Sequence, residues 1–394
     1  MKKIFNNQIV RSVFISMLIV FSMLCVVMPV SCRLTEEGVE IFPADTVAPS
    51  VEEFSVTGAR TIFISCSEKI VLSEISVVEY DGEEDLVLES VSPVDEKSVF
   101  AIAEAITYSE SMKSAEVELS SPTVVGKSYV FSGIVYDITG NSLEFQQKFS
   151  GYNENPARLI FNEVRSTYNK DKEQTEFVEF YVIKGGNTYG LEIVSAANGD
   201  AKKYSFPSIE VKTGELITVH GRTIEGTEEK AVDELGDDLT LSQTAESHDS
   251  ARDLWKSGDE KIVSQTDVLV LRDSASLEIK DALLMSVSGK TAWAKKSMTE
   301  FAEAACSLGI WKSGSLPENA VCTDGTNSSL YRSVSRQNTA LLAEKYADSA
   351  ALPEYIESSA SDWLVTDKLV ENKVTASGAT PGYENSTNPL VLNN

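Results

Sequence analysis

The sequence predicts a mainly β protein with two β-sandwiches in series, the second of which carries helical insertions. Three observations lead to this fold class. Short segments of alternating apolar and polar residues recur about every 8–12 positions and are separated by glycine, aspartate and proline, which is typical of sandwiches. Two later stretches instead repeat apolar residues with a helical period. The 394 residues suffice for two or three domains of ordinary size.

Charge and composition exclude several classes of function. The chain carries 34 Lys and Arg against 60 Asp and Glu, a net charge of −26. This field repels phosphate backbones, so we expect no nucleic-acid partner. The two histidines, His220 and His248, lie apart in the sequence, and there is no serine-nucleophile, phosphate-loop or His-Glu-x-x-His motif. We therefore expect no catalytic residue, no metal site and no cofactor.

The N-terminus predicts export. Lys2, Lys3 and Arg11 precede an apolar run at 12–30, which is the layout of a signal peptide. An uncleaved membrane helix is one alternative, because about 20 apolar residues can span a bilayer, and plain secretion without an anchor is another. The following segment, Pro29-Val30-Ser31-Cys32, resembles the lipobox of bacterial lipoproteins. Pro29 departs from the usual leucine, but spirochaetes tolerate looser lipoboxes.

This resemblance implies a signal peptide at 1–31 and acyl chains such as palmitate on Cys32. Two or three acyl chains hold a protein stably in a membrane, whereas one holds it only marginally. The cleaved chain would carry 31 basic and 60 acidic residues, a net charge of −29, so the lipid and not charge would attach it. We expect an exported protein on the bacterial envelope, at the outer membrane or cell surface and not the inner membrane, with residues 32–47 as a polar tether.

The first sandwich is predicted at 48–153. Ile62, Ile64 and Cys66 alternate along one strand and share a face, so Cys66 is expected to be a core thiol. Predicted strands cover 51–56, 61–66, 70–79, 86–91, 98–102, 115–119, 128–136 and 142–149. The pattern of Gly133, Val135, Asp137, Gly140 and Asn141 resembles Ig-like domains of bacterial cell-surface proteins. The resemblance implies a spacer or binding module.

Three acidic places in the chain raise the question of calcium. Asp137 and Asn141 could bind it, but we expect Asp137 to cap the turn that Gly140 completes. The acidic runs at 81–85 and 233–238 lack the spacing of an EF-hand. We expect both runs to be solvated loops.

The second sandwich is predicted at 156–386. The segments IFNEV at 160–164, EFVEFY at 176–181 and YSFP at 204–207, with Thr380-Pro381-Gly382 and Asn385 near the end, resemble the lamin-tail domain found in bacterial exported proteins. The resemblance implies a second Ig-like sandwich that is not itself an enzyme.

Two glutamates in these segments form a candidate acid–base pair. Strand alternation places Glu179 on the same face as Phe177 and Tyr181, an unusual position for a charged group. The lamin-tail resemblance makes Glu163 and Glu179 part of a structural signature. We therefore expect them to be buried and hydrogen-bonded to backbone amides, not to be catalytic.

Helical insertions are predicted near 291–308 and 338–350. Met298, Phe301 and Ala305 lie on one face of the first, and Leu341, Leu342 and Tyr346 on one face of the second. We expect both faces to pack on the core, with an exposed aromatic patch as the alternative. Cys306 and Cys322 are predicted to form a disulfide worth roughly 3 kcal/mol, with two free thiols as the alternative.

These observations favour a non-enzymatic, membrane-anchored envelope lipoprotein. Its sandwiches would act as a spacer and as a module that binds a protein or glycan ligand, which the sequence does not identify. One alternative is an accessory part of an extracellular hydrolase or nuclease system, because lamin-tail domains are often appended to such enzymes. A second alternative is a periplasmic scaffold.

Overall fold

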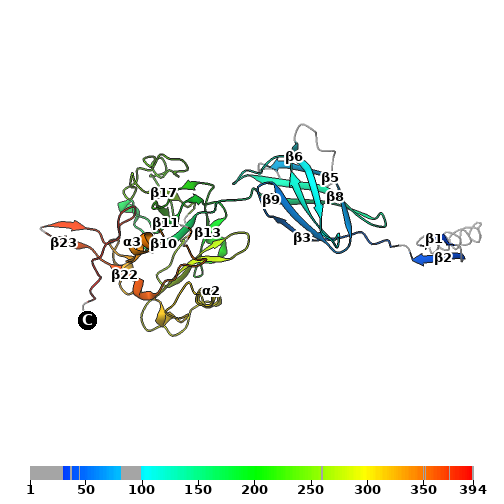
Figure 1. The fold of residues 1–394 in the computed structure, drawn as a ribbon. Coiled ribbons are helices and arrows are strands. Elements are labelled where there is room, and N and C mark those ends of the chain that lie inside the picture. Colours follow the sequence, from blue (N-terminus) through cyan, green and yellow to red (C-terminus); the bar gives the residue numbers. More distant parts are fainter. Residues whose placement is uncertain are drawn as a thin grey trace, which may run out of the picture. The chain divides into compact units, whose positions relative to one another are not determined.

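The computed structural model describes residues 30–35, 38–43, 45–80, 99–258, 261–348, 350, 352–371 and 373–392. It is mostly β, as the sequence predicted (Figure 1). The chain divides into two compact units, with the boundary between Tyr152 and Asn153. No helix in the described ranges is long and apolar enough to span a membrane.

The predicted signal peptide lies outside the described residues up to position 29. Cys32 lies on β1 (Val30–Thr35), which pairs antiparallel with β2 (Gly38–Pro43). A two-stranded hairpin therefore occupies most of the predicted tether. Acylation of Cys32 stays a prediction.

The first unit is a seven-stranded sheet that folds back on itself. Its order is β3-β4-β7-β6-β5-β8-β9. The first part of β6 pairs with β5 and its later part pairs with β7, so this strand passes from one half of the sheet to the other. The predicted strand at 86–91 and the acidic run at 81–85 lie outside the described residues. The strands are β3 (Val51–Val56), β4 (Thr61–Cys66), β5 (Ile70–Tyr80), β6 (Val99–Tyr108), β7 (Ser114–Leu119), β8 (Ser128–Asp137) and β9 (Ser142–Ser150).

Period-two alternation builds the core of this unit. Ile62, Ile64 and Cys66 on β4 are at most 1% exposed, which confirms Cys66 as a core thiol. Phe54 on β3 lies with its ring centroid 5.9 Å from that of Phe149 on β9, although these strands are at opposite ends of the sheet order. The two halves of the sheet therefore face each other across one core, as in a sandwich.

The second unit packs a six-stranded sheet, β17-β16-β11-β10-β21-β22, against a five-stranded sheet, β14-β13-β18-β19-β20. The first contains β10 (Arg158–Arg165), β11 (Phe177–Lys184), β16 (Leu216–His220), β17 (Arg252–Trp255), β21 (Ser333–Arg336) and β22 (Trp363–Thr366). The second contains β13 (Leu191–Ser195), β14 (Tyr204–Ser205), β18 (Asp267–Asp273), β19 (Ile279–Ser286) and β20 (Val321–Cys322). Two small ribbons are β12 (Gly186–Asn187) with β15 (Glu210–Val211), and β23 (Leu369–Glu371) with β24 (Val374–Ala376). Single 3₁₀ turns cover Lys170–Lys172, Asp200–Lys202, Pro317–Asn319, Thr326–Ser328 and Ala360–Asp362.

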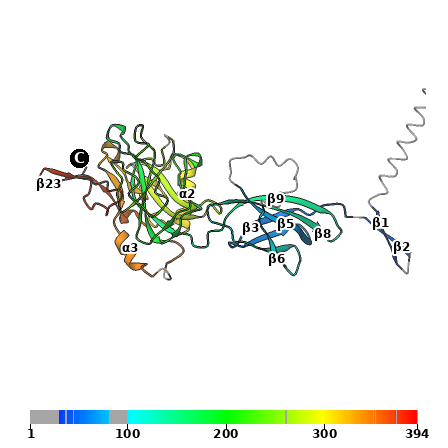
Figure 2. The same cartoon turned by 90° about the horizontal axis from the view of Figure 1, so that it is seen from above.

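Two helices pack on this unit at the predicted insertions (Figure 2). α2 (Lys296–Ser307) contacts β18 and β19, and its Met298, Ala302 and Ala305 belong to the main core. α3 (Thr339–Lys345) lies against β11 on the six-stranded sheet. Leu342 and Tyr346 there join a second, smaller core, whereas Leu341 is 67% exposed.

The outer face of the six-stranded sheet is also covered. Charged and polar side chains on this face are nearly inaccessible to solvent: Glu163, Arg165, Glu179, Thr218, His220, Ser333 and Ser335 are each at most 2% exposed. Buried charges are stable only when they are paired or hydrogen-bonded. The partners of these groups define the candidate site.

Candidate binding site

A β-bulge sets up the site. Along β10, the pairing with β11 shifts register between Phe161 and Glu163, so that Phe161 lies opposite Phe180 and Glu163 lies opposite Glu179. Asn162 is the extra residue, and a bulge re-aims side chains. Phe161 and Val164 remain in the main core, while both Asn162 and Glu163 bond to groups on the outer face.

Glu163 and Glu179 are both 0% exposed, and all four carboxylate oxygens accept hydrogen bonds. Glu163 accepts from the hydroxyls of Ser333 and Ser335, and from the backbone amide and hydroxyl of Thr380. Glu179 accepts from Asn162 Nδ2 (2.6 Å), Thr218 Oγ1 (3.2 Å) and the Gly382 amide (2.5 Å). The expected burial with backbone amide partners is confirmed.

Burial shifts the titration of this pair. Desolvation first, and the neighbouring charge of Glu163 second, together raise the pKa of Glu179 to about 8, against the hydrogen bonds that it accepts. Burial also raises the pKa of Glu163, although hydroxyl and amide donors oppose this shift. Since two adjacent buried carboxylates do not both ionise easily, Glu179 is the member of the pair that holds a proton at neutral pH.

The two carboxylates hold the segment 380–385, which we name the C-terminal loop. Gly382 has φ +77°, and a Cβ there would come within 2.7 Å of His248 Cβ, so glycine is required by both backbone conformation and space. Asn385 Nδ2 donates to the Asn162 carbonyl (3.1 Å) and to the Arg336 carbonyl (2.8 Å). The loop is therefore tied to β10 and β11 through Thr380 and Gly382, and to β10 and β21 through Asn385.

A pocket of about 470 Å³ lies between the C-terminal loop, α3 and strands β11 and β16. Asn162 forms part of its lining, and its Oδ1 accepts hydrogen bonds from Thr339 Oγ1 (2.7 Å) and Asn385 Nδ2 (3.1 Å). The same amide therefore links the pocket to Glu179. We name this cavity the loop pocket.

The sequence analysis did not identify the loop pocket. Asn162 and Asn385 were noted within the lamin-tail resemblance, but nothing indicated that they meet. The walls come from Tyr181, Leu216, Ala343 and Tyr383, which are distant in sequence.

A second buried cluster lies on the same sheet. His220 Nε2 is 2.6 Å from Asp253 Oδ1, its Nδ1 is 3.2 Å from Thr175 Oγ1, and its ring stacks on Trp255 with centroids 3.9 Å apart. The order Thr–His–Asp resembles a nucleophile triad. His220 is 0% exposed and Thr175 is 1% exposed, so no substrate reaches the hydroxyl, and the cluster supports the fold.

In the first unit, Asp137 caps the predicted turn. Its Oδ1 accepts from the amides of Thr139, Gly140 and Asn141, and its Oδ2 accepts from Asn141 Nδ2. Burial alone would raise its pKa, but these donors hold the pKa below its ordinary value. Asp45 and Glu68 each bring one carboxylate oxygen to within 4.8 Å of Asp137. The Asp137 oxygens are already used by the turn.

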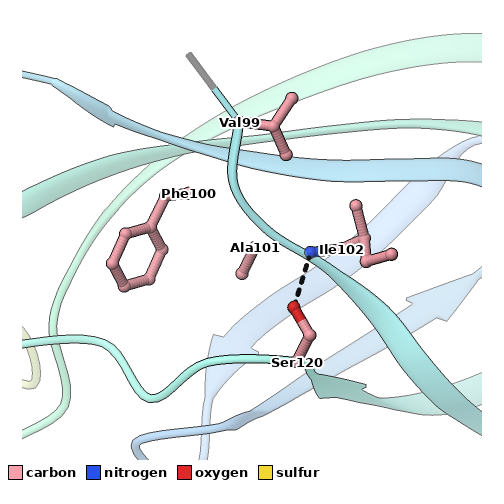
Figure 3. A pocket seen from close by; sticks show the side chains of 5 residues that line it. All are labelled: Val99, Phe100, Ala101, Ile102 and Ser120. Carbon is pink, nitrogen blue, oxygen red and sulfur yellow. Dashed lines mark hydrogen bonds between the residues drawn. The ribbon is translucent and has the colours of Figure 1, made fainter. Parts of the chain in front are cut away.

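A hollow of about 370 Å³ lies at the start of β6 in the first unit (Figure 3). It is lined by Val99, Phe100, Ala101, Ile102 and Ser120, and the Ile102 amide donates to Ser120 Oγ (3.1 Å). This lining holds no ionisable group, so it offers no acid–base chemistry.

The predicted disulfide is absent, since Cys306 and Cys322 are free thiols. Cys306 lies in the last turn of α2, which faces the core. On β20 the neighbouring Val321 is buried, and strand alternation therefore turns Cys322 outward, where it is exposed. A suitable separation of two cysteines along the sequence does not by itself bring their thiols into the geometry that a disulfide requires.

Residues 157–365 match the family described as TP_1001_2nd, protein second domain. The chain belongs to this family. A Treponema pallidum (strain Nichols) protein, described as uncharacterized, is 31% identical over 210 residues, which are 51% of this chain and 51% of that protein. The chain thus spans about half the length of this spirochaete relative. The matched part of this chain contains the bulge, both glutamates and α3.

Two solved structures show weak similarity. The N-terminal part of the bacterial S-layer protein SbsC is 13% identical, with a TM-score of 0.22, and the match covers 62% of this chain and 45% of that one. A DUF4876 family protein from Bacteroides thetaiotaomicron is 11% identical, with a TM-score of 0.24, and the match covers 72% and 84%. The lipobox and lamin-tail resemblances stay predictions.

Proposed function

We propose that this chain is a non-catalytic, lipid-anchored envelope protein whose second unit binds a ligand in the loop pocket and whose first unit is a spacer. One contrast supports this function. The ionisable clusters on the six-stranded sheet are buried and bonded to their own chain, whereas the loop pocket beside them is open and has a fixed floor. The arrangement suits binding better than chemistry.

The buried glutamates are poorly placed for catalysis. A general acid or base must come within hydrogen-bonding reach of a substrate proton. The Glu163 and Glu179 carboxylates are inaccessible to solvent, and each of their oxygens already accepts a hydrogen bond. A substrate would have to displace the C-terminal loop to reach them.

The anchor is tested by Cys32→Ser in the full chain expressed in a bacterium. We expect wild type to incorporate radiolabelled palmitate and to partition into detergent, and the variant to do neither. Labelling of both proteins would place the lipid on another residue. Labelling of neither would remove the lipid anchor from the proposal. Protease added to intact cells separates a surface protein, which is cut, from a periplasmic scaffold, which stays whole.

The hydrolase alternative has its own test. The purified full chain is incubated with DNA and with a phosphodiester substrate in the presence of Mg²⁺, Mn²⁺ or Zn²⁺. We expect no turnover above the buffer. Cleavage that co-purifies with the chain and is lost in Glu163→Gln would contradict a non-catalytic function.

A further inference from the structure

The loop pocket has the mixed lining of a small-molecule site. Its volume of about 470 Å³ falls within the range of roughly 300–1,000 Å³ typical of such sites. Apolar surface comes from Leu216 on β16 and from Ala340 and Ala343 on α3. Aromatic rings come from Tyr181 on β11 and from Tyr383 on the C-terminal loop. Tyr383 is 56% exposed.

Polar groups at the rim can both donate and accept hydrogen bonds. Gln337 contributes its amide oxygen, because its Nε2 already donates to the Ser335 and Ser386 carbonyls. Thr387 contributes a hydroxyl and Glu384 a carboxylate, and all three residues are exposed. The Tyr383 and His248 rings pack in a T-shaped arrangement, with centroids 3.9 Å apart. An exposed, fixed aromatic ring beside hydroxyl and amide groups matches a ligand with a flat C–H face and an edge of hydroxyls.

Charge argues against an anionic ligand. Arg336 also lines the pocket, but its side chain is 0% exposed. Its Nε donates to the Phe161 carbonyl (2.7 Å), and its guanidinium lies over the Trp363 ring. The charged group at the open rim is the Glu384 carboxylate, in a chain of net charge −26. Phosphates and carboxylates would therefore be repelled.

The sheet order argues against an extended peptide. Peptides commonly bind sheets by adding a strand to an exposed edge. The strands beneath the loop pocket, β11 and β16, each pair on both sides, β11 with β10 and β16, and β16 with β11 and β17. No free strand edge faces the pocket at these strands.

We propose that the loop pocket binds a neutral saccharide, one to three sugar rings long, with a ring face on Tyr383 and hydroxyls on Gln337, Glu384 and Thr387. This inference rests on the proposed binding function and names its ligand class. The site is preorganised, because the Asn162–Asn385 pair and the two buried carboxylates fix the floor and the C-terminal loop before a ligand arrives.

The test uses the full chain in detergent micelles. An array of neutral mono-, di- and trisaccharides identifies the best binder, and titration calorimetry measures its affinity, with a basic decapeptide as the competing ligand class. We expect a dissociation constant on the order of 0.1 mM. Ala343→Trp fills the pocket, and Leu341→Trp, on the same helix but 67% exposed and outside the pocket, is the matched control.

We expect Ala343→Trp to weaken saccharide binding by at least about 10-fold and Leu341→Trp to leave it within about twofold. If Ala343→Trp misfolds, Tyr383→Ala serves as the second pocket variant, because it is a surface change that leaves α3 intact. We expect Tyr383→Ala to weaken saccharide binding by a similar factor. Absence of saccharide binding, binding unchanged in both pocket variants, or pocket-dependent binding of the peptide instead would each overturn the proposal. Cleavage of the bound saccharide would support the site but contradict the non-catalytic function.

Discussion

Glu179→Gln is predicted to remove a pH dependence from the stability of the second unit. In the folded protein the pKa of Glu179 is raised to about 8, whereas in the unfolded chain it is near the model-peptide value of about 4.3. Between these values the folded state holds a proton that the unfolded state has lost. The free energy of unfolding therefore falls as pH rises, by about 1.4 kcal/mol per pH unit.

The window from pH 6 to pH 8 isolates this effect. Asp267 is a second buried acid, with its pKa raised to about 6 mainly by burial, so its contribution is largely lost below that window. Across the two pH units, the wild type should lose about 2 kcal/mol of stability through Glu179, because the slope falls off as the pH reaches the folded-state pKa. Glu179→Gln cannot ionise, and its amide loses one of the acceptor oxygens, which costs about 1–3 kcal/mol at every pH.

Urea titration followed by tryptophan fluorescence is a suitable assay, because Trp255, Trp293, Trp311 and Trp363 all lie in the second unit. Glu344→Gln, an exposed change on α3, is the control and should keep the wild-type slope. Equal slopes for wild type and Glu179→Gln between pH 6 and pH 8 would show that Glu179 is ionised in the folded state, and the reasoning would fail.

Three further predictions address other parts of the chain. Phe180→Ala should destabilise the second unit by about 3–5 kcal/mol, because Phe180 is 0% exposed in the main core; a change under 1 kcal/mol in the urea titration would contradict this packing. Asp137→Asn should lower the melting temperature of the first unit at neutral pH and weaken the acid sensitivity of that unit. The folded-state pKa of Asp137 is lowered, so the stabilisation that its carboxylate provides is lost as pH falls through that value. Tyrosine circular dichroism measures both effects, and an unchanged acid midpoint would count against the cap. Of Cys66, Cys306 and Cys322, a thiol reagent should react first with exposed Cys322 and then with Cys306. It should react with Cys66 only on unfolding, because burial raises the pKa of Cys66 to about 11. Failure of Cys306 and Cys322 to react without a reducing agent would restore the disulfide.

The alternation of apolar and polar residues along the sequence predicted much of the fold. The strand β4 has a strict two-residue period that placed Ile62, Ile64 and Cys66 in the core, and the helical periods located α2 and α3. Glu179 stood out because its face also carried aromatic residues. That conflict correctly indicated a buried carboxylate, since polar residues at core positions of a strand require specific partners.

The candidate site depends on features that a local pattern does not contain. The bulge at Asn162 inserts one residue into β10 without any glycine or proline to indicate it. The backbone amides that donate to Glu163 and Glu179 belong to Thr380 and Gly382, about 200 residues later. The error over Cys306 and Cys322 has the same cause, because their separation in sequence says nothing about the direction in which each side chain points.

The central claim is that the two buried glutamates hold the C-terminal loop against the sheet and so shape the loop pocket. Amide hydrogen exchange at Thr380 and Gly382, whose amides donate to Glu163 and Glu179, measures this most directly. We predict slow exchange in the wild type and much faster exchange at these two amides in Glu163→Gln and Glu179→Gln, with the amides of β18 and β19 unchanged as an internal control. Fast exchange at both amides in the wild type, or no change in either variant, would contradict the account.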